Sequence, residues 1–261
     1  MKRRQTRIGL FTGLLAAGAL WSSAAAALAN TAAMGSALTE TSDTNLCTAP
    51  CLAVQQSQAG TSESLPLRSP ANGVLVEWAI VSTDNVTFAL RILRPDGQDT
   101  YTDAGTVLAP TPDPNPHGPG PLILRYPASL KIERGDAIGI YAIGGDSDAG
   151  VPQSNTPGTP SNVWATNDMG QPIDGGTATF TPEAGHELLL QATVQFCSVP
   201  SLKGLKKVTA KQQLAASDCG VKVKKRPTSK RKFRGKVLKQ KVEPGTTAVP
   251  GRIVTIVIGQ K

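Results

Sequence analysis

Short apolar or alternating runs recur along residues 52–196, and segments rich in glycine, proline and aspartate separate them. In GVLVEWAIV and VTFALRIL, apolar side chains at every second position indicate strands with one buried face. Nine such runs within about 150 residues predict a mainly β fold, an antiparallel β-sandwich with jelly-roll-like pairing. The runs are residues 52–56, 73–81, 86–93, 120–126, 129–132, 137–143, 162–166, 177–180 and 186–196.

Turn and loop signals lie between these runs. RPDG at residues 94–97 and ERGD at residues 133–136 predict hairpin-type turns. Residues 109–121, which contain six prolines, and residues 144–161, which are polar and rich in glycine and proline, predict long surface loops. Each loop is either an edge for ligand binding or tolerated surface variation.

The pattern changes after residue 198. Val208, Ala210, Leu214 and Ala215 predict one face of a short helix, which a glycine cap at Cys219-Gly220 ends. Alternating positions near residues 221–224 and 236–238, and a nearly continuous apolar run at 253–258, predict three strands. The pattern therefore predicts a small α+β domain with one helix on a three-stranded sheet.

Charge separates the chain into three blocks. Residues 1–29 hold four basic residues and no acid, residues 30–197 hold six basic and seventeen acidic residues, and residues 198–261 hold seventeen basic and two acidic residues. The composition, 39% hydrophobic and 4% aromatic, excludes a multi-span membrane protein. A basic module of this kind suits an anionic partner, which could be nucleic acid, an envelope polymer or the acidic domain itself.

The N-terminus resembles a secretory signal. MKRRQTR is a positive segment, IGLFTGLLAAGAL is apolar, and SSAAAALA ends in small residues before Asn30, so we expect cleavage after Ala29. A retained membrane anchor is the alternative reading of the same run. Export predicts a secreted, extracellular, cell-wall-associated protein with no membrane span after cleavage and no nucleic acid partner. Residues 30–46 lack periodicity and predict a flexible leader.

An exported protein with four cysteines is expected to form disulfides. Their spacing favours the pairs Cys47–Cys51 and Cys197–Cys219. Zinc is the rival interpretation, but C-x₃-C without a second cysteine or histidine pair is poor ligand spacing, so neither a metal nor a cofactor is predicted. The predicted organisation is a signal peptide at 1–29, a leader at 30–46, an acidic β-sandwich at 47–197 and a basic domain at 198–261.

The basic residues of the last domain are concentrated in one stretch, residues 222–236, which contains no acid and a single aromatic. The absence of interleaved aromatics and of a recognition helix is atypical of nucleic acid binding. We expect either contact with an anionic envelope polymer or a solvated hairpin without a ligand. The candidate polymer-binding residues are Lys222, Lys224, Lys225, Arg226, Lys230, Arg231, Lys232, Arg234 and Lys236.

Two family resemblances add to this interpretation. Residues 199–261 contain, in this order, Val199-Pro200, Gly204, Ala210, Leu214, GKVLKQ (235–240), Pro244-Gly245-Thr246 and VPGRIVTIVIG (249–259). With these motifs the segment resembles a PASTA domain, the small extracytoplasmic unit of penicillin-binding proteins and of kinases that sense peptidoglycan, and the resemblance implies peptidoglycan as a partner. Lys206 stands where that family usually has a Ser or Thr helix cap. Residues 47–196 are similar to a β-sandwich module of secreted actinobacterial proteins, which implies only a fold and a location outside the cell.

Catalytic constellations are poorly supported. Gly145-Asp146-Ser147 resembles an esterase nucleophile motif with His186 as a conceivable base, but no strand-to-helix elbow surrounds it. Glu77 and Glu133 lie on different predicted strands and do not predict a carboxylate pair. We therefore expect a non-enzymatic envelope binding protein. The alternative is a secreted hydrolase, active on an ester or a glycan, with the basic domain as its wall-targeting module.

Overall fold

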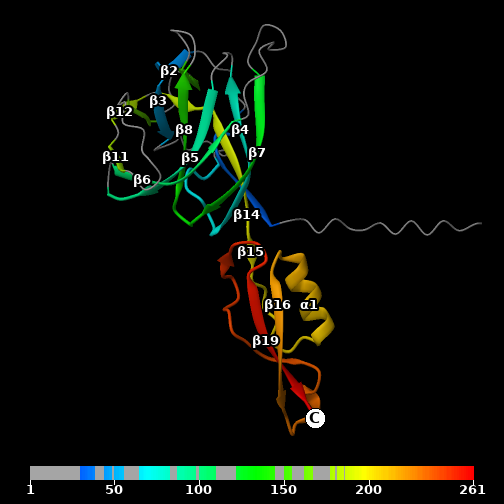
Figure 1. Cartoon of the computed structure of the whole chain (residues 1–261). Helices are drawn as coiled ribbons and strands as arrows, with labels where there is room; N and C mark the ends of the chain where they lie inside the picture. Colours follow the sequence, from blue (N-terminus) through cyan, green and yellow to red (C-terminus); the bar gives the residue numbers. More distant parts are fainter. Residues whose placement is uncertain are drawn as a thin grey trace, which may run out of the picture.

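The computed structural model describes residues 30–38, 44–48, 50–55, 65–82, 87–97, 100–109, 122–144, 150–154, 162–166, 177–179, 181–184 and 186–261. The fold is mainly β, as predicted, with a β-sandwich followed by a small α+β domain. Figure 1 shows the two parts end to end, joined where the chain leaves β14.

The sandwich has two main sheets, and the smaller one has four antiparallel strands in the order β1-β14-β4-β7. The predicted strands at 120–126 and 129–132 are one continuous strand, β7, which pairs along the whole length of β4. The strands are β1 (Thr31–Gly35), β4 (Gly73–Ser82), β7 (Leu122–Ile132) and β14 (Leu190–Gln195).

The second sheet has seven antiparallel strands in the order β11-β6-β5-β8-β3-β10-β12. These are β3 (Cys51–Gln55), β5 (Thr87–Pro95), β6 (Thr100–Leu108), β8 (Ala137–Gly144), β10 (Asn162–Thr166), β11 (Thr177–Thr179) and β12 (Thr181–Ala184). A third sheet contains β2 (Thr44–Thr48), β9 (Gly150–Ser154) and β13 (Glu187–Leu188).

The two large sheets bury one apolar core between them. Leu75, Trp78 and Ile80 of β4 and Leu90 and Ile92 of β5 belong to the same buried cluster. On β5, residues two apart share this face, as the alternation in the sequence predicts. On β4, a bulge between Leu75 and Glu77 interrupts the alternation, so Leu75 and Trp78, three residues apart, are buried in the same core. The predicted sandwich is confirmed.

The prediction of a flexible leader at residues 30–46 is wrong for Thr31–Gly35, which form strand β1. β1 pairs with β14, and the Met34 side chain is fully buried in the sandwich core. Gly35 follows with a φ of 96°, and a Cβ there would lie 2.2 Å from the Leu190 carbonyl oxygen. Small residues therefore let this segment lie close against β14, and such residues carry little strand periodicity.

Two loop predictions also need correction. The turn at residues 133–136 does not close a hairpin, because β7 and β8 belong to different sheets. Asp136 stabilises this crossover, since its carboxylate accepts hydrogen bonds from the Glu133 N–H at 2.8 Å and from Arg94 at 3.0 and 3.1 Å. The hydrogen bonds to Asp136 raise the pKa of Arg94. Part of the predicted loop at 144–161 is strand β9, whereas residues 110–121, 145–149 and 155–161 lie outside the described residues.

The C-terminal domain places one helix on a three-stranded sheet, as predicted. The sheet order is β16-β19-β17, in which β16 pairs with β19 in parallel and β17 in antiparallel fashion. Alternate residues Val254, Ile256 and Ile258 of the central strand are buried with the helix. The elements are β15 (Cys197–Ser198), α1 (Lys207–Ala216), β16 (Gly220–Pro227), η1 (Arg231–Phe233), β17 (Val237–Gln240), β18 (Thr247–Ala248) and β19 (Ile253–Gln260).

The helix face is narrower than predicted. Only Ala210 and Leu214 of α1 are buried, four residues apart, whereas Val208 is 65% exposed and Ala215 is exposed. Lys206 supplies no side-chain cap, as expected, but the Lys207 N–H donates to the Gly235 carbonyl at 3.1 Å. A backbone acceptor thus replaces the missing side-chain acceptor at this end of the helix.

The predicted glycine cap at the other end is wrong. Asp218 has the left-handed conformation, with a φ of 52°, and Gly220 already belongs to β16. The Asp218 and Cys219 N–H groups donate to the carbonyls of Ala215 and Leu214, which is the Schellman pattern. Within the described residues, no helix is long and apolar enough to cross a membrane.

Candidate functional site

A groove of about 620 Å³ lies on the C-terminal domain. Each of the three strands contributes to it: Arg226 comes from β16, Val257 from β19 and Leu238 from β17. An apolar floor with cationic groups around it can hold an anionic group that is attached to a sugar or an aliphatic chain. The lining residues are Ser201, Lys203, Arg226, Leu238, Lys239, Gln240, Pro244 and Val257.

A β-bulge shapes the floor of the groove. Val237 lies opposite Ile258, and Lys239 lies opposite the next residue back, Val257, so Leu238 is an extra residue in β17. Val237 and Ile258 are buried in the core, while Leu238 and Val257 are half-buried and line the groove. The bulge therefore adds an apolar side chain to the groove without removing Val237 from the core.

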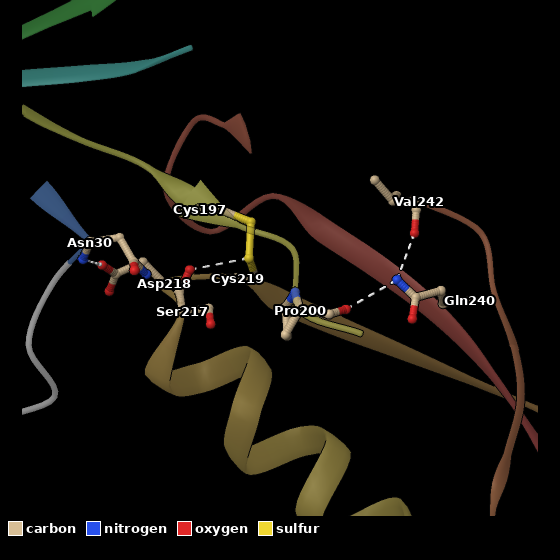
Figure 2. The surroundings of a disulfide bond; sticks show 8 residues. All are labelled: Asn30, Cys197, Pro200, Ser217, Asp218, Cys219, Gln240 and Val242. Atoms are coloured by element: carbon tan, nitrogen blue, oxygen red, sulfur yellow. Dashed lines mark hydrogen bonds between the residues drawn. A yellow bond between two sulfur atoms is a disulfide. The ribbon is translucent and has the colours of Figure 1, made fainter. Parts of the chain in front are cut away.

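Gln240 fixes the entry segment beside the groove (Figure 2). Its amide group donates to the carbonyls of Pro200 at 3.2 Å and Val242 at 2.9 Å, and its carbonyl accepts from the Leu202 N–H at 2.8 Å. Ser201 and Lys203, which flank Leu202, line the groove. One glutamine thus holds the segment that supplies one of the three cations.

The groove has a positive electrostatic character. Lys203, Arg226 and Lys239 line it, and no carboxylate does. Residues 198–261 are all described, and their two acids, Asp218 and Glu243, form no ion pair with any of their lysines or arginines. No acid of the domain therefore neutralises the groove cations through an ion pair.

The structure separates the nine predicted polymer-binding residues. Arg226 lines the groove, whereas the other eight do not. Lys222, Lys224, Lys225, Lys230, Arg231, Lys232 and Arg234 are exposed, and Lys236 is half-buried. The Lys232 ammonium lies 5.3 Å from the centre of the Phe233 ring, close enough for a cation–π contact.

The predicted hairpin at residues 222–236 is wrong. β16 and β17 lie on opposite sides of β19, so the basic stretch passes from one edge of the sheet to the other. Gly259 permits this crossing, because a Cβ there would lie 2.4 Å from the Phe233 carbonyl oxygen. A crossover spreads the charges over the end of the sheet, whereas a hairpin would place them on two adjacent strands.

Sequence reasoning missed Lys203 and Lys239, the other two groove cations. The alternation in GKVLKQ could have placed Lys239 on a strand, but the bulge at Leu238 changes which face each residue occupies. Lys203 lies in a segment without strand or helix periodicity. Its position depends on Gln240, a contact across 38 residues.

The predicted disulfide Cys197–Cys219 is confirmed, with Cα atoms 4.9 Å apart (Figure 2). Cys197 lies in β15, where the chain enters the domain, and Cys219 directly follows Asp218, shortly after the end of α1. Cys51 also forms a disulfide. The Cys47 side chain lies outside the described residues, so its pairing with Cys51 stays a prediction.

The sandwich offers little catalytic geometry among its described residues. Glu77 pairs with Arg125 at 2.9 Å and Glu133 with Arg94 at 3.3 Å, so the two carboxylates belong to separate ion pairs. His186 is half-buried, and Gly145, Asp146 and Ser147 of the esterase-like motif lie outside the described residues. No group of three potential metal ligands occurs among the residues that the structure describes.

The fold and the groove define the C-terminal part as a small α+β domain suited to an anionic ligand. Residues 198–260 match the PASTA domain family, which confirms the resemblance found in the sequence. PASTA domains typically bind peptidoglycan, and a PASTA domain indicates a cell-wall or envelope role. No curated protein and no solved structure matches the chain. The similarity of the sandwich to a secreted module therefore stays a prediction.

Proposed function

We propose that this protein is exported to a bacterial envelope, where its PASTA domain binds peptidoglycan or an anionic wall polymer and holds the acidic sandwich at the wall. The groove carries this proposal: three cations and no carboxylate line it, around an apolar floor of Leu238 and Val257. Carboxylates of peptide stems and phosphates of wall polymers both offer the anion that such a groove can accept.

The exposed basic residues have a second role in this proposal. Those outside the groove stay solvated when a ligand fills it, so each contributes a weak, salt-screened attraction to an anionic surface. Arg226 belongs to both sets, because it lies in the basic stretch and lines the groove. The stretch brings the domain to the wall, and the groove provides the specific contact.

Export is supported by the N-terminal pattern and by the disulfides. A positive segment, an apolar segment and small residues before Asn30 are typical of a secretory signal. Disulfides persist in oxidising compartments and are rare in the cytosol. Location outside the cell makes nucleic acid a poor partner for the basic domain and leaves wall polymers as the anions within reach.

Sedimentation with purified cell wall tests the proposal. Residues 30–261 should sediment with wall at low salt, and soluble wall fragments should compete. Wall stripped of its anionic polymers distinguishes the two partners, because binding that survives stripping indicates peptidoglycan and binding that disappears indicates the polymer. Failure to sediment with either preparation would contradict the proposed function.

We also propose that the sandwich has no enzymatic activity of its own. A hydrolase screen of residues 30–261 against esters and glycans checks this point. Turnover that Ser147→Ala abolishes would support the alternative, in which the PASTA domain targets a secreted hydrolase to the wall.

A further inference from the structure

Asn30 lies at the junction of the two domains. Its backbone N–H donates a hydrogen bond of 2.9 Å to Oδ2 of Asp218 in the PASTA domain (Figure 2), and its carbonyl accepts one of 2.9 Å from the Phe196 N–H in the sandwich. The disulfide between Cys197 and Cys219 joins the residues that directly follow Phe196 and Asp218. The hydrogen bond from Phe196 and the adjacent disulfide therefore keep Asn30 next to Asp218.

The negative charge of Asp218 is unfavourable at its position unless a cation approaches it. The residue has a left-handed φ of 52°, a conformation that glycine adopts most readily and that asparagine and aspartate tolerate. It also follows the C-terminus of α1, where the helix dipole repels a negative charge. Among the described residues, no lysine or arginine forms an ion pair with it. Its carboxylate instead accepts the hydrogen bond from the Asn30 N–H.

The donor atom in this hydrogen bond is the atom that signal cleavage would change. Hydrolysis of the Ala29–Asn30 peptide bond by a signal peptidase adds water across it, leaving a carboxylate on Ala29 and an amine on Asn30. That amine takes up a proton at neutral pH, since α-amino groups have a pKa near 8. A neutral amide with one hydrogen becomes an ammonium with three.

We propose that removal of the leader creates an ammonium on Asn30 that forms an ion pair with Asp218, so that processing strengthens the contact between the sandwich and the PASTA domain. This inference rests on the export in the proposed function. The ammonium lies where the carboxylate and the helix C-terminus both favour positive charge. Export would then couple maturation to a fixed arrangement of the acidic and basic domains.

Two forms of the chain test the ion pair without export. In one, protease removal of a fusion partner leaves Asn30 as the first residue; in the other, Ala27, Leu28 and Ala29 remain in front of it, which moves the amine away. Each form is made with Asp218, with Asp218→Asn and with Glu243→Gln. Asparagine keeps an acceptor and tolerates the left-handed conformation. Glu243→Gln is the matched control, because it removes the domain's only other acid.

Urea unfolding followed by the helix signal at 222 nm gives the result. Asp218→Asn should lower the folding equilibrium constant about fivefold when Asn30 is the first residue, and less than about twofold in the extended form. Glu243→Gln should change neither form. Equal effects of Asp218→Asn in the two forms would overturn the ion pair.

N-terminal sequencing of the protein secreted by a bacterial host tests the processing step. Asn30 as the first residue supports the inference, and any other first residue overturns it. Because the fusion-derived chains need neither export nor cell wall, failure of the ion pair is distinguishable from failure of the proposed function.

Discussion

The side-chain oxygen of Gln240 accepts a hydrogen bond of 2.8 Å from the backbone N–H of Leu202. Leu202 is fully buried in the PASTA core, and its two neighbours in sequence line the groove. The same amide group also donates to two backbone carbonyls. One side chain therefore links the stability of the domain to the shape of the groove.

We expect Gln240→Leu to reduce the stability of the PASTA domain by about 2–3 kcal/mol, because three hydrogen bonds to backbone groups are lost and each contributes about 1 kcal/mol. Denaturant unfolding followed by circular dichroism measures the change. Gln213→Leu, the same substitution at an exposed helix position, should change stability by less than about 0.5 kcal/mol. Similar effects of the two variants would contradict a bracing role for Gln240.

The disulfide between Cys197 and Cys219 closes a segment of 22 residues. Replacing both cysteines by serine should cost about 3 kcal/mol, since the cross-link restricts the unfolded chain. Unfolding of the variant and of the parent chain should agree when both are reduced, because Cys51 also forms a disulfide. Mass mapping of a nonreduced digest should find the Cys197–Cys219 peptide and the predicted Cys47–Cys51 peptide, and a Cys47–Cys197 peptide would refute this pairing.

The sequence predicted those parts of the fold that periodicity encodes. The alternation in residues 73–81 and 86–93 became β4 and β5, and the spacing of Ala210 and Leu214 marked the buried face of α1. These elements bury large apolar side chains at regular intervals, which is the information that a pattern carries.

Elements without periodicity were missed. β1 consists mostly of small residues, and only its pairing with β14 reveals why Gly35 is needed. The groove depends on the bulge at Leu238 and on a contact between Gln240 and Leu202, 38 residues apart. Long-range contacts of this kind have no local signal in a single sequence.

Met34 provides a test of the ordered N-terminal strand. Its side chain is fully buried between the sheets, so Met34→Ala should destabilise the sandwich by about 3 kcal/mol. Fluorescence of the buried Trp78 follows the unfolding of this domain. Thr31→Ala, at an exposed position of the same strand, serves as the control. A small effect at Met34, equal to that at Thr31, would support a flexible leader instead.

Arg91 and Asp103 form a buried ion pair on the outer face of the seven-stranded sheet, with Arg91 placed over the Tyr141 ring. Arg91→Met and Asp103→Leu should each cost about 3–5 kcal/mol, because each removes one member of a buried ion pair and leaves the other charge in the protein interior. The double variant should cost clearly less than the sum. Additive effects in thermal unfolding would argue against coupling between the two side chains.

The exposed pair of Arg125 and Glu77 supplies the matched comparison for Arg91. Its side chains are 55% and 45% exposed, and Arg125→Met should cost less than about 1 kcal/mol in the same measurement. A large effect at Arg125 would mean that loss of the long side chain, rather than loss of a buried charge, explains the result at Arg91.

Wall binding should separate the groove cations from the rest of the basic stretch. Replacing Lys203, Arg226 and Lys239 by glutamine should weaken sedimentation with cell wall at least about tenfold, because charge-assisted hydrogen bonds in the groove are lost. The matched variant, with Lys224, Lys230 and Lys232 replaced by glutamine, removes the same charge from outside the groove. We expect it to bind about threefold more weakly, since exposed charges contribute little each and are screened within about 8 Å at physiological salt.

The salt dependence of the same assay distinguishes the two contributions. Binding by the parent chain should weaken as salt is added, and the part that survives high salt should disappear in the groove variant alone. Glutamine at Lys224, Lys225, Lys230, Arg231 and Lys232 together, all outside the groove, should release the protein if exposed charge alone drives association. Equal binding by the groove variant and its matched control would show that the wall recognises the net charge of the domain, and would exclude the groove as the site.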